Sequence, residues 1–539
     1  MPESRSPSDI LLTADAMREA DRMTIEDVGL PGFTLMETAG RGATSAILGR
    51  FGPADAMRAL IICGKGNNGG DGLVVARCLV EAGAHVHVVC TASPDAMRDD
   101  PAQNYTILRR LSESNGAVAE RLTLTQPDDV DALDAEAKSF RPTLYVDAML
   151  GTGLTSEVRE PIRSLVEWLN RQTEPVAALD IPTGLHSDTG RVLGVCVKAD
   201  QTATMASMKA GLVVGHGSIH SGDVDVVDIG MPRHVLDGVA TGPGCAFRTS
   251  DADLRSWWPE RSRDAHKYSV GMTLVVGGAP GYTGAPVMAS LAAARAGSGY
   301  VACACPESIQ PALAQKLTAI PTIPLPEWED GLAPEIAKTL AEPLEKARAL
   351  LVGPGLGRER ETQSSIRSFL SEIEHPAVID ADGLNAIAGS LGADDTDLNP
   401  NGRWILTPHA GEFQRLLGEK IDLSDPVRTA QTYARRWNVV LLLKGHPSVV
   451  AAPDGKTFVG GTGGPALAVA GTGDVLAGLC AGFLAQGLDP VRAAAAAMHL
   501  GGAAADRYAK KADPRTLVAT DLLDLLPAAA RASVEFSTR

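Results

Sequence analysis

The chain has 539 residues, a formal net charge of −16 and a charged content of 21%. A chain of this length exceeds what one hydrophobic core can hold, so more than one domain is expected. The negative charge argues against a nucleic-acid-binding protein, which needs a basic face to neutralise phosphates. No apolar run is long enough to span a membrane, so we expect neither nucleic acid nor a membrane as a partner.

Cysteine usage indicates the cellular compartment. The eight cysteines are scattered and no C-x-x-C pair is present, so we interpret them as reduced core thiols rather than a disulfide framework. The first residues, Met-Pro-Glu-Ser-Arg-Ser-Pro-Ser-Asp, lack the apolar stretch of a signal peptide, and their acidic residues fit a transit peptide poorly. Both observations predict a cytoplasmic protein.

In the first half of the chain, short β-branched runs alternate with amphipathic stretches. The pattern predicts strands at 59–63, 84–90, 143–147, 175–180 and 224–229, with helices at 72–82 and 161–172. Strands that alternate with helices form βαβ units, whose parallel sheet is covered on both faces. We therefore predict an α/β domain with a Rossmann-like three-layer αβα arrangement.

A glycine-rich loop, Gly64-Lys-Gly-Asn-Asn-Gly-Gly-Asp-Gly, follows the first of these strands and precedes a helix. Free backbone N–H groups at such a helix start can bind an anion. The spacing of its glycines fits the dinucleotide fingerprint, but the next strand runs into Thr91-Ala92-Ser93 without the acidic residue that holds a ribose hydroxyl. A phosphate-binding loop and a merely tight turn both remain open.

Polar residues follow two later strands. Asp147 and Asp180 each end a strand, and strand ends line the ligand crevice of an open α/β sheet. We expect these two residues to share one pocket with Asn67, Asn68, Asp71 and Thr183. Oxygens of this kind suit a hard cation, and a spare carboxylate suits proton transfer. For each Asp, capping of a helix N-terminus is the alternative.

The alternation breaks off around 231–265, in a stretch rich in Gly and Pro that ends in a charged run. We place the boundary there and assign 1–238 and 239–539 to two domains. The second domain restarts the α/β pattern. It is expected to contain strands at 272–277, 300–305, 349–353, 377–380, 404–406 and 439–444, and helices at 286–296, 412–418, 474–486 and 490–508.

A second glycine-rich loop, Ala470-Gly-Thr-Gly-Asp-Val-Leu-Ala-Gly, opens one of these helices. Its backbone N–H groups can bind a transferring phosphoryl group, and Asp474 can take a proton from a hydroxyl. The chain has no G-x-x-x-x-G-K-[ST] Walker loop. A plain helix cap is the alternative.

Other polar residues are expected to be structural. His85 and His87 lie on one face of a strand, and we interpret them as a surface pair on an edge strand rather than a metal site. Cys303 and Cys305 lie in an apolar strand and are expected in the core. Neither an HExxH motif nor a nucleophile elbow is present.

The first half resembles the NAD(P)H-hydrate epimerase domain. The resemblance covers roughly 10–235 and rests on Leu12-Thr-Ala-Asp-Ala-Met-Arg-Glu-Ala-Asp-Arg, Gly66-Asn-Asn-Gly-Gly-Asp-Gly, Asp180-Ile-Pro-Thr-Gly and Gly222-Asp-Val-Asp-Val-Val-Asp-Ile-Gly-Met-Pro. It implies a potassium ion bound by Asn68, Asp147 and Thr183. It also implies that the hydrated dinucleotide is bound by Asn67, Asn68, Gly69, Gly70, Asp71, Gly151, Thr152, Gly153, Leu154, Thr155, Ser156, Glu157 and Asp180. Our hypothesis is that Asp180 is the catalytic acid/base.

The second half resembles the ADP/ATP-dependent NAD(P)H-hydrate dehydratase domain, a ribokinase-like α/β fold. The match covers about 250–527 and rests on His266-Lys-Tyr-Ser-Val-Gly, Gly353-Pro-Gly-Leu-Gly, Asp380-Ala-Asp-Gly-Leu-Asn and Leu406-Thr-Pro-His-Ala-Gly-Glu-Phe. It implies that Ala285, Gly355, His409 and the catalytic Asp474 surround the hydrate. It implies that the adenine nucleotide, with Mg²⁺, is held by Lys444, Gly445, His446, Pro447, Ser448, Gly471, Thr472 and Gly473.

Together the two resemblances imply a bifunctional repair enzyme for NADHX and NADPHX, the hydrated forms of NADH and NADPH. One site would interconvert the R and S forms, and the other would dehydrate the S form at the expense of ADP, giving NAD(P)H, AMP and phosphate. The ADP preference follows from analogy with fused prokaryotic members, and a homo-oligomer is expected on fold analogy alone. The alternatives are a metabolite kinase built on the second domain and a first domain that binds without catalysing.

Overall fold

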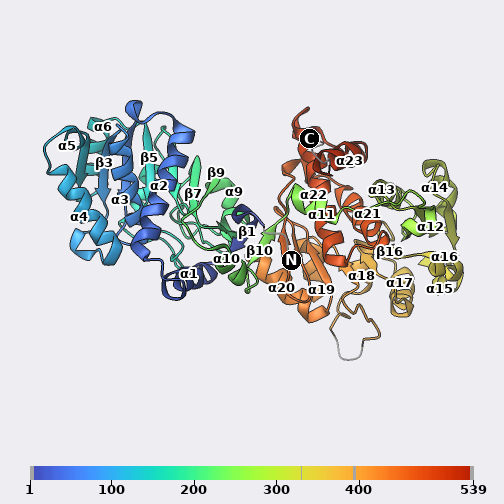
Figure 1. The fold of residues 1–539 in the computed structure, drawn as a ribbon. Coiled ribbons are helices and arrows are strands. Elements are labelled where there is room, and N and C mark those ends of the chain that lie inside the picture. The colour runs from blue at the N-terminus through green and yellow to red at the C-terminus, as the bar shows by residue number, and fades with distance from the viewer. Residues whose placement is uncertain (1–4, 329–330, 393–395, 535–539) are drawn as a thin grey trace. The chain divides into compact units, whose positions relative to one another are not determined.

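The computed structural model describes residues 5–328, 331–392 and 396–534. The chain divides into two compact units, Met1–Ala246 (unit 1) and Phe247–Arg539 (unit 2). Each unit has helices on a mainly parallel sheet, which confirms the predicted α/β class (Figure 1). No helix in the described parts of the chain has both the length and the apolarity needed to cross a membrane.

The sheet of unit 1 is parallel throughout, in the order β4-β3-β2-β5-β6-β7-β9. Its strands are β2 Arg58–Cys63, β3 His85–Cys90, β4 Leu122–Thr125, β5 Leu144–Ala148, β6 Val176–Leu179, β7 Gln201–Met205 and β9 Asp223–Val227. All five predicted strands are present. Two strands of the sheet, β4 and β7, were not predicted. The polar sequence of β7, Gln-Thr-Ala-Thr-Met, is not typical of a buried strand, although every residue of it is buried.

The expected edge position of the two histidines is wrong. Strand β3 lies between β2 and β4 and is therefore an interior strand. His87 is buried, with its Nε2 2.9 Å from Thr125 Oγ1 and 3.3 Å from Glu136 Oε2. Burial lowers the pKa of His87, against the opposing effect of Glu136. This histidine is thus a satisfied interior residue.

Helices cover both faces of the unit 1 sheet. Leu60 and Ile62 of β2 belong to the core cluster that includes Leu133 of α6 and Val166 of α7, whereas Ile61 faces α3. This alternation is what a strand buried on both faces requires. The principal helices are α1 Ala14–Arg22, α2 Gly32–Phe51, α3 Asn67–Glu81, α4 Asp99–Ser112, α6 Val130–Phe140 and α7 Ile162–Leu169.

Helix α3 begins at Asn67, before the predicted start at 72. Glycines are poor helix formers, so the sequence alone delays the start. In the structure, close packing requires them: a Cβ on Gly69 would lie 1.8 Å from the carbonyl oxygen of Gly64, and one on Gly72 would lie 2.6 Å from Ala148 Cβ. Packing against β5 therefore overrides helix propensity at this end of α3.

The sheet of unit 2 runs in the order β13-β12-β11-β16-β17-β18-β19-β20-β21-β10, and only β20 is antiparallel to its neighbours. Its strands are β10 Ala246–Arg248, β11 Met272–Val276, β12 Tyr300–Pro306, β13 Thr322–Leu325, β16 Ala349–Val352, β17 Ala377–Ile379, β18 Trp404–Leu406, β19 Val440–Leu443, β20 Val449–Ala451 and β21 Thr457–Val459. All six predicted strands are found.

The four predicted helices of unit 2 are also present. They are α13 Gly284–Arg295, α19 Ala410–Leu417, α21 Thr472–Ala485 and α22 Pro490–Ala509. Further helices include α17 Arg360–Glu372, α18 Asp382–Ala386, α20 Pro426–Trp437 and α23 Ala519–Val534.

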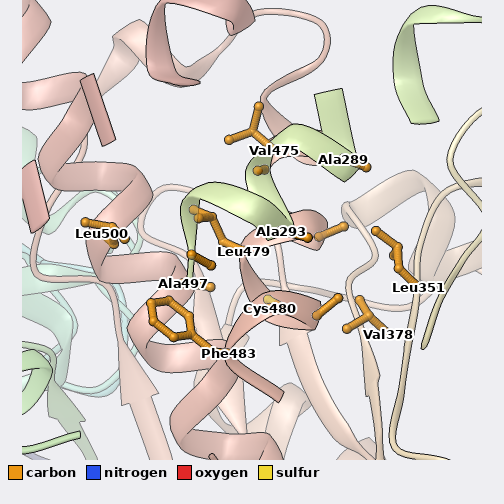
Figure 2. Close-up of a cluster of buried hydrophobic side chains, with 14 of the residues drawn as sticks. Ala289, Ala293, Leu351, Val378, Val475, Leu479, Cys480, Phe483, Ala497 and Leu500 are labelled. Carbon is orange, nitrogen blue, oxygen red and sulfur yellow. The ribbon is translucent and has the colours of Figure 1, made fainter. Parts of the chain in front are cut away.

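The core of unit 2 is centred on α21, which is apolar on nearly all sides (Figure 2). Leu479 and Phe483 of this helix pack with side chains from α13, α22 and the sheet. A Cβ on Gly478 would lie 2.2 Å from the carbonyl oxygen of Ala289, so glycine lets α21 and α13 approach closely. Tight packing along α21 fixes its N-terminus, where Asp474 lies, against the sheet.

Candidate active sites

Unit 1 contains a cavity of about 620 Å³ at the carboxyl ends of its central strands. Its walls come from α1, α2, the start of α3 and the segments that follow β5, β6 and β7. Seven charged side chains line it: Arg18, Asp21, Lys65, Asp71, Asp100, Asp180 and Lys209. This is the position in which open α/β sheets bind ligands.

Most residues predicted for the first site adjoin this cavity. The lining includes Asn67, Asn68, Asp71, Gly151, Thr152, Gly153, Leu154 and Asp180. Gly69 and Gly70 lie one layer back in α3, and Thr155, Ser156 and Glu157 are not among the lining residues. Asp147 and Thr183 lie beneath the wall, in contact with residues that form it. The structure therefore brings the predicted carboxylates of the first site together.

A buried polar layer lies under the cavity floor. Thr183 donates to Asp147 twice, from its backbone N–H to Oδ2 (2.8 Å) and from its hydroxyl to Oδ1 (2.7 Å). Asn68 Nδ2 donates to the Leu150 carbonyl at 3.1 Å, while Asn68 Oδ1 is buried and has no hydrogen-bond partner among the residues that the structure describes. Burial raises the pKa of Asp147 to about 6, against the hydrogen bonds it accepts.

Asp180 lies just after β6 in a left-handed conformation, with φ +62°. Its N–H donates to the Ala203 carbonyl of β7 at 2.8 Å. Its Oδ1 accepts from Lys209 Nζ at 2.5 Å and from the Met205 N–H at 3.3 Å. A residue with a side chain rarely adopts this φ, and such strain, held by surrounding bonds, is typical of functional sites.

Two further carboxylates lie near this ion pair. Asp71, in α3, is only 9% exposed. Burial raises the pKa of Asp71 well above its usual value; the charges of Asp180 and Asp21 raise it further and that of Lys209 lowers it. Burial also raises the pKa of Asp21, to about 6. The cavity thus holds carboxyl groups whose environments favour different protonation states.

In unit 2 the polar residues gather at the carboxyl ends of β16 to β19. Lys444 Nζ lies 2.9 Å from Asp380 Oδ1 and 3.8 Å from Glu412 Oε2. Thr407 donates its hydroxyl hydrogen to the same Asp380 oxygen at 2.7 Å. Burial alone would lower the pKa of Lys444, but the two carboxylates raise it above its usual value. The lysine is therefore charged in the folded protein.

Asp474 lies in the first turn of α21, beside this cluster. Burial raises the pKa of Asp474 to about 7, with a further contribution from the charge of Asp380. Gly471 caps the helix with φ +92°, and a Cβ on Gly473 would lie 3.3 Å from Lys444 Nζ. A carboxylate with a pKa near neutrality at a helix N-terminus is suited to proton transfer.

The other predicted residues of the second site occupy neighbouring loops. His409 caps α19, with its Nδ1 accepting from the Gly411 N–H at 3.0 Å, and pairs with Lys444 in a β-bridge. Gly355 has φ +68°, and a Cβ there would lie 3.2 Å from Ala285 Cβ. The Gly445, His446, Pro447 and Ser448 turn joins β19 to β20, and the hydroxyl of Thr472 donates to the carbonyls of Leu467 and Val469 at 3.0 Å each.

Sequence reasoning missed one partner at each site. Lys209 was not proposed at all, and Asp380 was quoted within a motif without a role. A signal was available for each, because a single Lys within the apolar segments 203–214 and 439–444 must find an anionic partner if it is buried. What the sequence could not supply was which carboxylate that partner is.

The comparisons with known proteins agree with the two-unit structure. The family model described as NAD(P)H-hydrate dehydratase matches residues 273–528, and the one described as YjeF-related protein N-terminus matches 32–211. The "Bifunctional NAD(P)H-hydrate repair enzyme Nnr" of Salinibacter ruber is 59% identical over 519 residues, covering 96% of this chain and 95% of the relative. The chain belongs to the family of bifunctional NAD(P)H-hydrate repair enzymes.

Other relatives are more distant. The enzyme of the same name from Moorella thermoacetica is 40% identical over 522 residues, with 96% of each chain covered. The ADP/ATP-dependent NAD(P)H-hydrate dehydratase of Bacillus subtilis, a crystal structure, is 28% identical and covers 53% of this chain and 97% of its own, with a TM-score of 0.44. The family resemblance stated for both halves of the sequence is confirmed.

Proposed function

We propose that the chain repairs hydrated NADH and NADPH at two sites, with the epimerase site in the cavity of unit 1 and the dehydratase site around Asp474 of unit 2. The first site interconverts the R and S hydrates. The second converts the S hydrate to NAD(P)H with ADP, which becomes AMP and phosphate. The observation that carries the proposal is that each unit holds a Lys–Asp pair with one fully buried and one partly exposed member, Lys209–Asp180 and Lys444–Asp380, at the carboxyl edge of its sheet.

At the first site the substrate hydroxyl is on the carbon beside the ring nitrogen, so epimerisation requires proton transfer at a carbinolamine. Asp180 is the acid/base of this reaction. Its Oδ2 faces the loop at Gly151, since a Cβ there would lie 3.7 Å from that oxygen. Backbone N–H groups of 66–69, at the start of α3, hold the pyrophosphate, whereas the Gly70 N–H donates to the Gly66 carbonyl at 3.0 Å.

The buried layer below this site fits a potassium ion. Asn68 Oδ1 has no hydrogen-bond partner, and Asp147 is fully buried without a cationic partner among the described residues. A buried carboxylate beside an unpaired amide oxygen favours a hard cation. Asn68, Asp147 and Thr183 would hold it, and the ion would neutralise the buried charge under the substrate.

At the second site Asp474 takes the proton of the hydrate's hydroxyl while the oxygen attacks the terminal phosphoryl group of ADP. AMP leaves. The phosphorylated hydrate then loses phosphate from one ring carbon and a proton from the next, and the C–H electron pair forms the double bond that restores the dihydronicotinamide. Phosphate is a far better leaving group than hydroxide, which explains why a kinase-like site serves a dehydratase. The pKa of Asp474, about 7, suits a general base at neutral pH.

Nucleotide binding is assigned to the turn at 444–448 and the start of α21. Lys444 Nζ makes one hydrogen bond, to Asp380, so it retains donors for a phosphate oxygen. Mg²⁺ is usually held by one or two carboxylates together with substrate phosphates, and Asp382, whose side chain is 20% exposed, would supply such a carboxylate. The ion would offset the charge on the transferred phosphoryl group. The eight free cysteines support a reducing, cytoplasmic location.

The test is incubation of purified protein with a mixture of R and S hydrates. With ADP, both forms are expected to disappear and NAD(P)H to appear in equal amount. Without ADP, the two forms should only approach their equilibrium ratio. No recovery of NAD(P)H with either ADP or ATP would contradict the dehydratase, and an unchanged R form would contradict the epimerase.

A further inference from the structure

The two oxygens of Asp180 have different surroundings. Oδ1 accepts from Lys209 Nζ at 2.5 Å, the Met205 N–H at 3.3 Å and the Thr204 hydroxyl at 3.4 Å. No described residue donates to Oδ2, which faces Gly151 on the cavity wall. The carboxylate is therefore held through one oxygen and presents the other to the cavity.

The ammonium group of Lys209 donates all of its hydrogen bonds to protein atoms. The Lys209 side chain is 1% exposed, and its ammonium group donates to Asp180 Oδ1, to the Thr204 hydroxyl at 3.0 Å and to the Met205 carbonyl at 2.7 Å. An ammonium group has three hydrogens, so all are used. Lys209 therefore has no donor left for a substrate, and Asp180 is the one carboxylate in the described part of the chain to which it donates a hydrogen bond.

Asp71 has the opposite environment. It is 9% exposed, and no described residue donates a hydrogen bond to its carboxyl group. Its electrostatic neighbours, Asp180 and Asp21, are carboxylates, and both burial and their charge raise the pKa of Asp71, while Lys209 lowers it. The other charged side chains around the cavity are Arg18, Lys65 and Asp100. A buried carboxyl group beside other carboxylates keeps its proton.

We propose that the epimerase divides its proton transfer between two carboxyl groups: Asp180, paired with Lys209 through Oδ1 and open to the cavity at Oδ2, is the base, and Asp71, buried in the cavity wall without a hydrogen-bond donor among the described residues, is the acid. The proposal rests on the epimerase function proposed above and assigns the partner of Asp180. Asp71 and Asp180 are the catalytic residues in this scheme because both line the cavity. Lys209 is a positioning residue.

In the ring-opening step, Asp180 takes the hydroxyl proton, and the O–H electron pair forms the C=O bond of an open-chain aldehyde. The bond from that carbon to the ring nitrogen breaks, its electron pair stays on nitrogen, and the nitrogen takes the proton of Asp71. After rotation of the aldehyde, the reverse transfers close the ring on the other face. Both carboxyl groups return to their starting states, and no other reactant is consumed.

The test is the pH dependence of kcat/KM for R-to-S conversion in the full chain, measured for the wild type, Asp71→Asn and Asp180→Asn. The wild type should give a bell-shaped profile. Asp71→Asn should lower kcat by about 100-fold or more with little change in KM, and the alkaline limb should vanish from its residual activity. Asp180→Asn should instead lose the acidic limb. Asp55→Asn removes an exposed carboxylate far from the cavity wall and should change neither limb.

Lys209 is tested by Lys209→Met and Lys209→Arg. Lys209→Met removes the cation that pairs with Asp180 Oδ1, so the acidic limb of its activity profile should move to higher pH. Lys209→Arg keeps the charge and should return the limb toward its wild-type position. A residue needed only for packing would lower activity without moving the limb.

Each outcome bears on one claim. If the wild type does not interconvert the hydrates, the proposed epimerase function fails. If the wild type does so but Asp71→Asn keeps its alkaline limb, only the division of labour fails. An acidic limb that stays in place in Lys209→Met would overturn the positioning role. Should Lys209→Met not fold, the Asp71→Asn and Asp180→Asn profiles still decide the acid and the base.

Discussion

Each unit has a Lys–Asp ion pair at the carboxyl edge of its sheet, but the two lysines differ in exposure and in the number of hydrogen bonds that they donate to the protein. In unit 1, Lys209 is 1% exposed and donates to three protein acceptors. In unit 2, the Lys444 side chain is 20% exposed, and among the described residues its ammonium group hydrogen-bonds only to Asp380. A fully satisfied lysine can only set the charge state of its neighbour, whereas a partly satisfied one can also meet an incoming phosphate.

The proton-transferring carboxyl groups proposed for the two sites, Asp71 and Asp474, also differ in their surroundings. Asp71 lines the cavity but is only 9% exposed, and burial raises its pKa well above the usual value, so it is suited to donate a proton. Asp474 has a pKa of about 7 at a helix N-terminus, so it is ionised often enough to accept one. One unit is therefore built for reversible proton transfer and the other for phosphoryl transfer from a hydroxyl.

The largest expected effect is that of Asp474→Asn, which removes the proton acceptor of the second site. Dehydration should fall by about 10²–10⁴-fold, while R-to-S conversion by the same protein stays at the wild-type rate. Both rates are measured on one preparation. Asp524→Asn, an exposed carboxylate on α23, is the matched control and should affect neither. A parallel loss of both activities would contradict the separation of the sites.

Replacing each lysine by methionine should lower the free energy of unfolding by different amounts. Lys444→Met leaves Asp380, whose side chain is 2% exposed, as an unpaired buried charge, and should lower the free energy of unfolding by about 3–5 kcal/mol. Lys209→Met leaves Asp180, which is 16% exposed and keeps two other donors, so its loss should be smaller. Urea denaturation measures both, with exposed Lys511→Met as control. Equal losses would mean that the exposure of the remaining carboxylate does not matter.

Replacing a glycine by alanine should have different effects at the two sites, because the added Cβ would clash with backbone at Gly64 and would contact only a side chain at Gly473. A Cβ at Gly64 would lie 1.9 Å from the Met149 carbonyl oxygen, so Gly64→Ala should destabilise unit 1 by about 1–3 kcal/mol and abolish epimerisation alone.

A Cβ at Gly473 would lie 3.3 Å from Lys444 Nζ, at the far end of a long side chain, and would meet no other described atom within 4 Å. Gly473→Ala should keep the fold and weaken ADP binding by about 1 kcal/mol, roughly fivefold in KM. Thermal unfolding and ADP titration distinguish the two.

The mildest perturbation, which needs no substitution, is a change of pH during dehydratase turnover. Because Asp474 must be ionised to accept a proton and its pKa is about 7, kcat/KM should rise with pH and level off above about 7. Well below that value it should fall about tenfold per pH unit. A rate that stays constant between pH 5.5 and 8, or that rises on acidification, would rule out Asp474 as the base.

Much of the fold could be predicted from the sequence because its strands are short, β-branched and separated by clear turns. The exceptions have physical causes. The start of α3 was predicted late because Gly69 and Gly72 are poor helix formers that close packing nevertheless requires. Strand β7 was missed because its Gln and Thr side chains are buried against expectation.

The site residues that could be predicted are those that belong to recognisable sequence motifs. Asp147, Asp180 and Asp474 were proposed because each ends a strand or opens a helix, where ligands bind. The charge state of each depends on which lysine reaches it across the sheet, and that pairing is a tertiary contact. Lys209 is 29 positions from Asp180 and Lys444 is 64 from Asp380, so no local pattern links either pair.

The most direct test of two separate active sites in one chain is complementation between Asp180→Asn and Asp474→Asn. With mixed hydrates and ADP, Asp180→Asn alone should consume only the S form, and Asp474→Asn alone should equilibrate R and S without forming NAD(P)H. An equal mixture of the two proteins should convert all of the hydrate. If the mixture recovers no more NAD(P)H than Asp180→Asn alone, the two sites do not act as described.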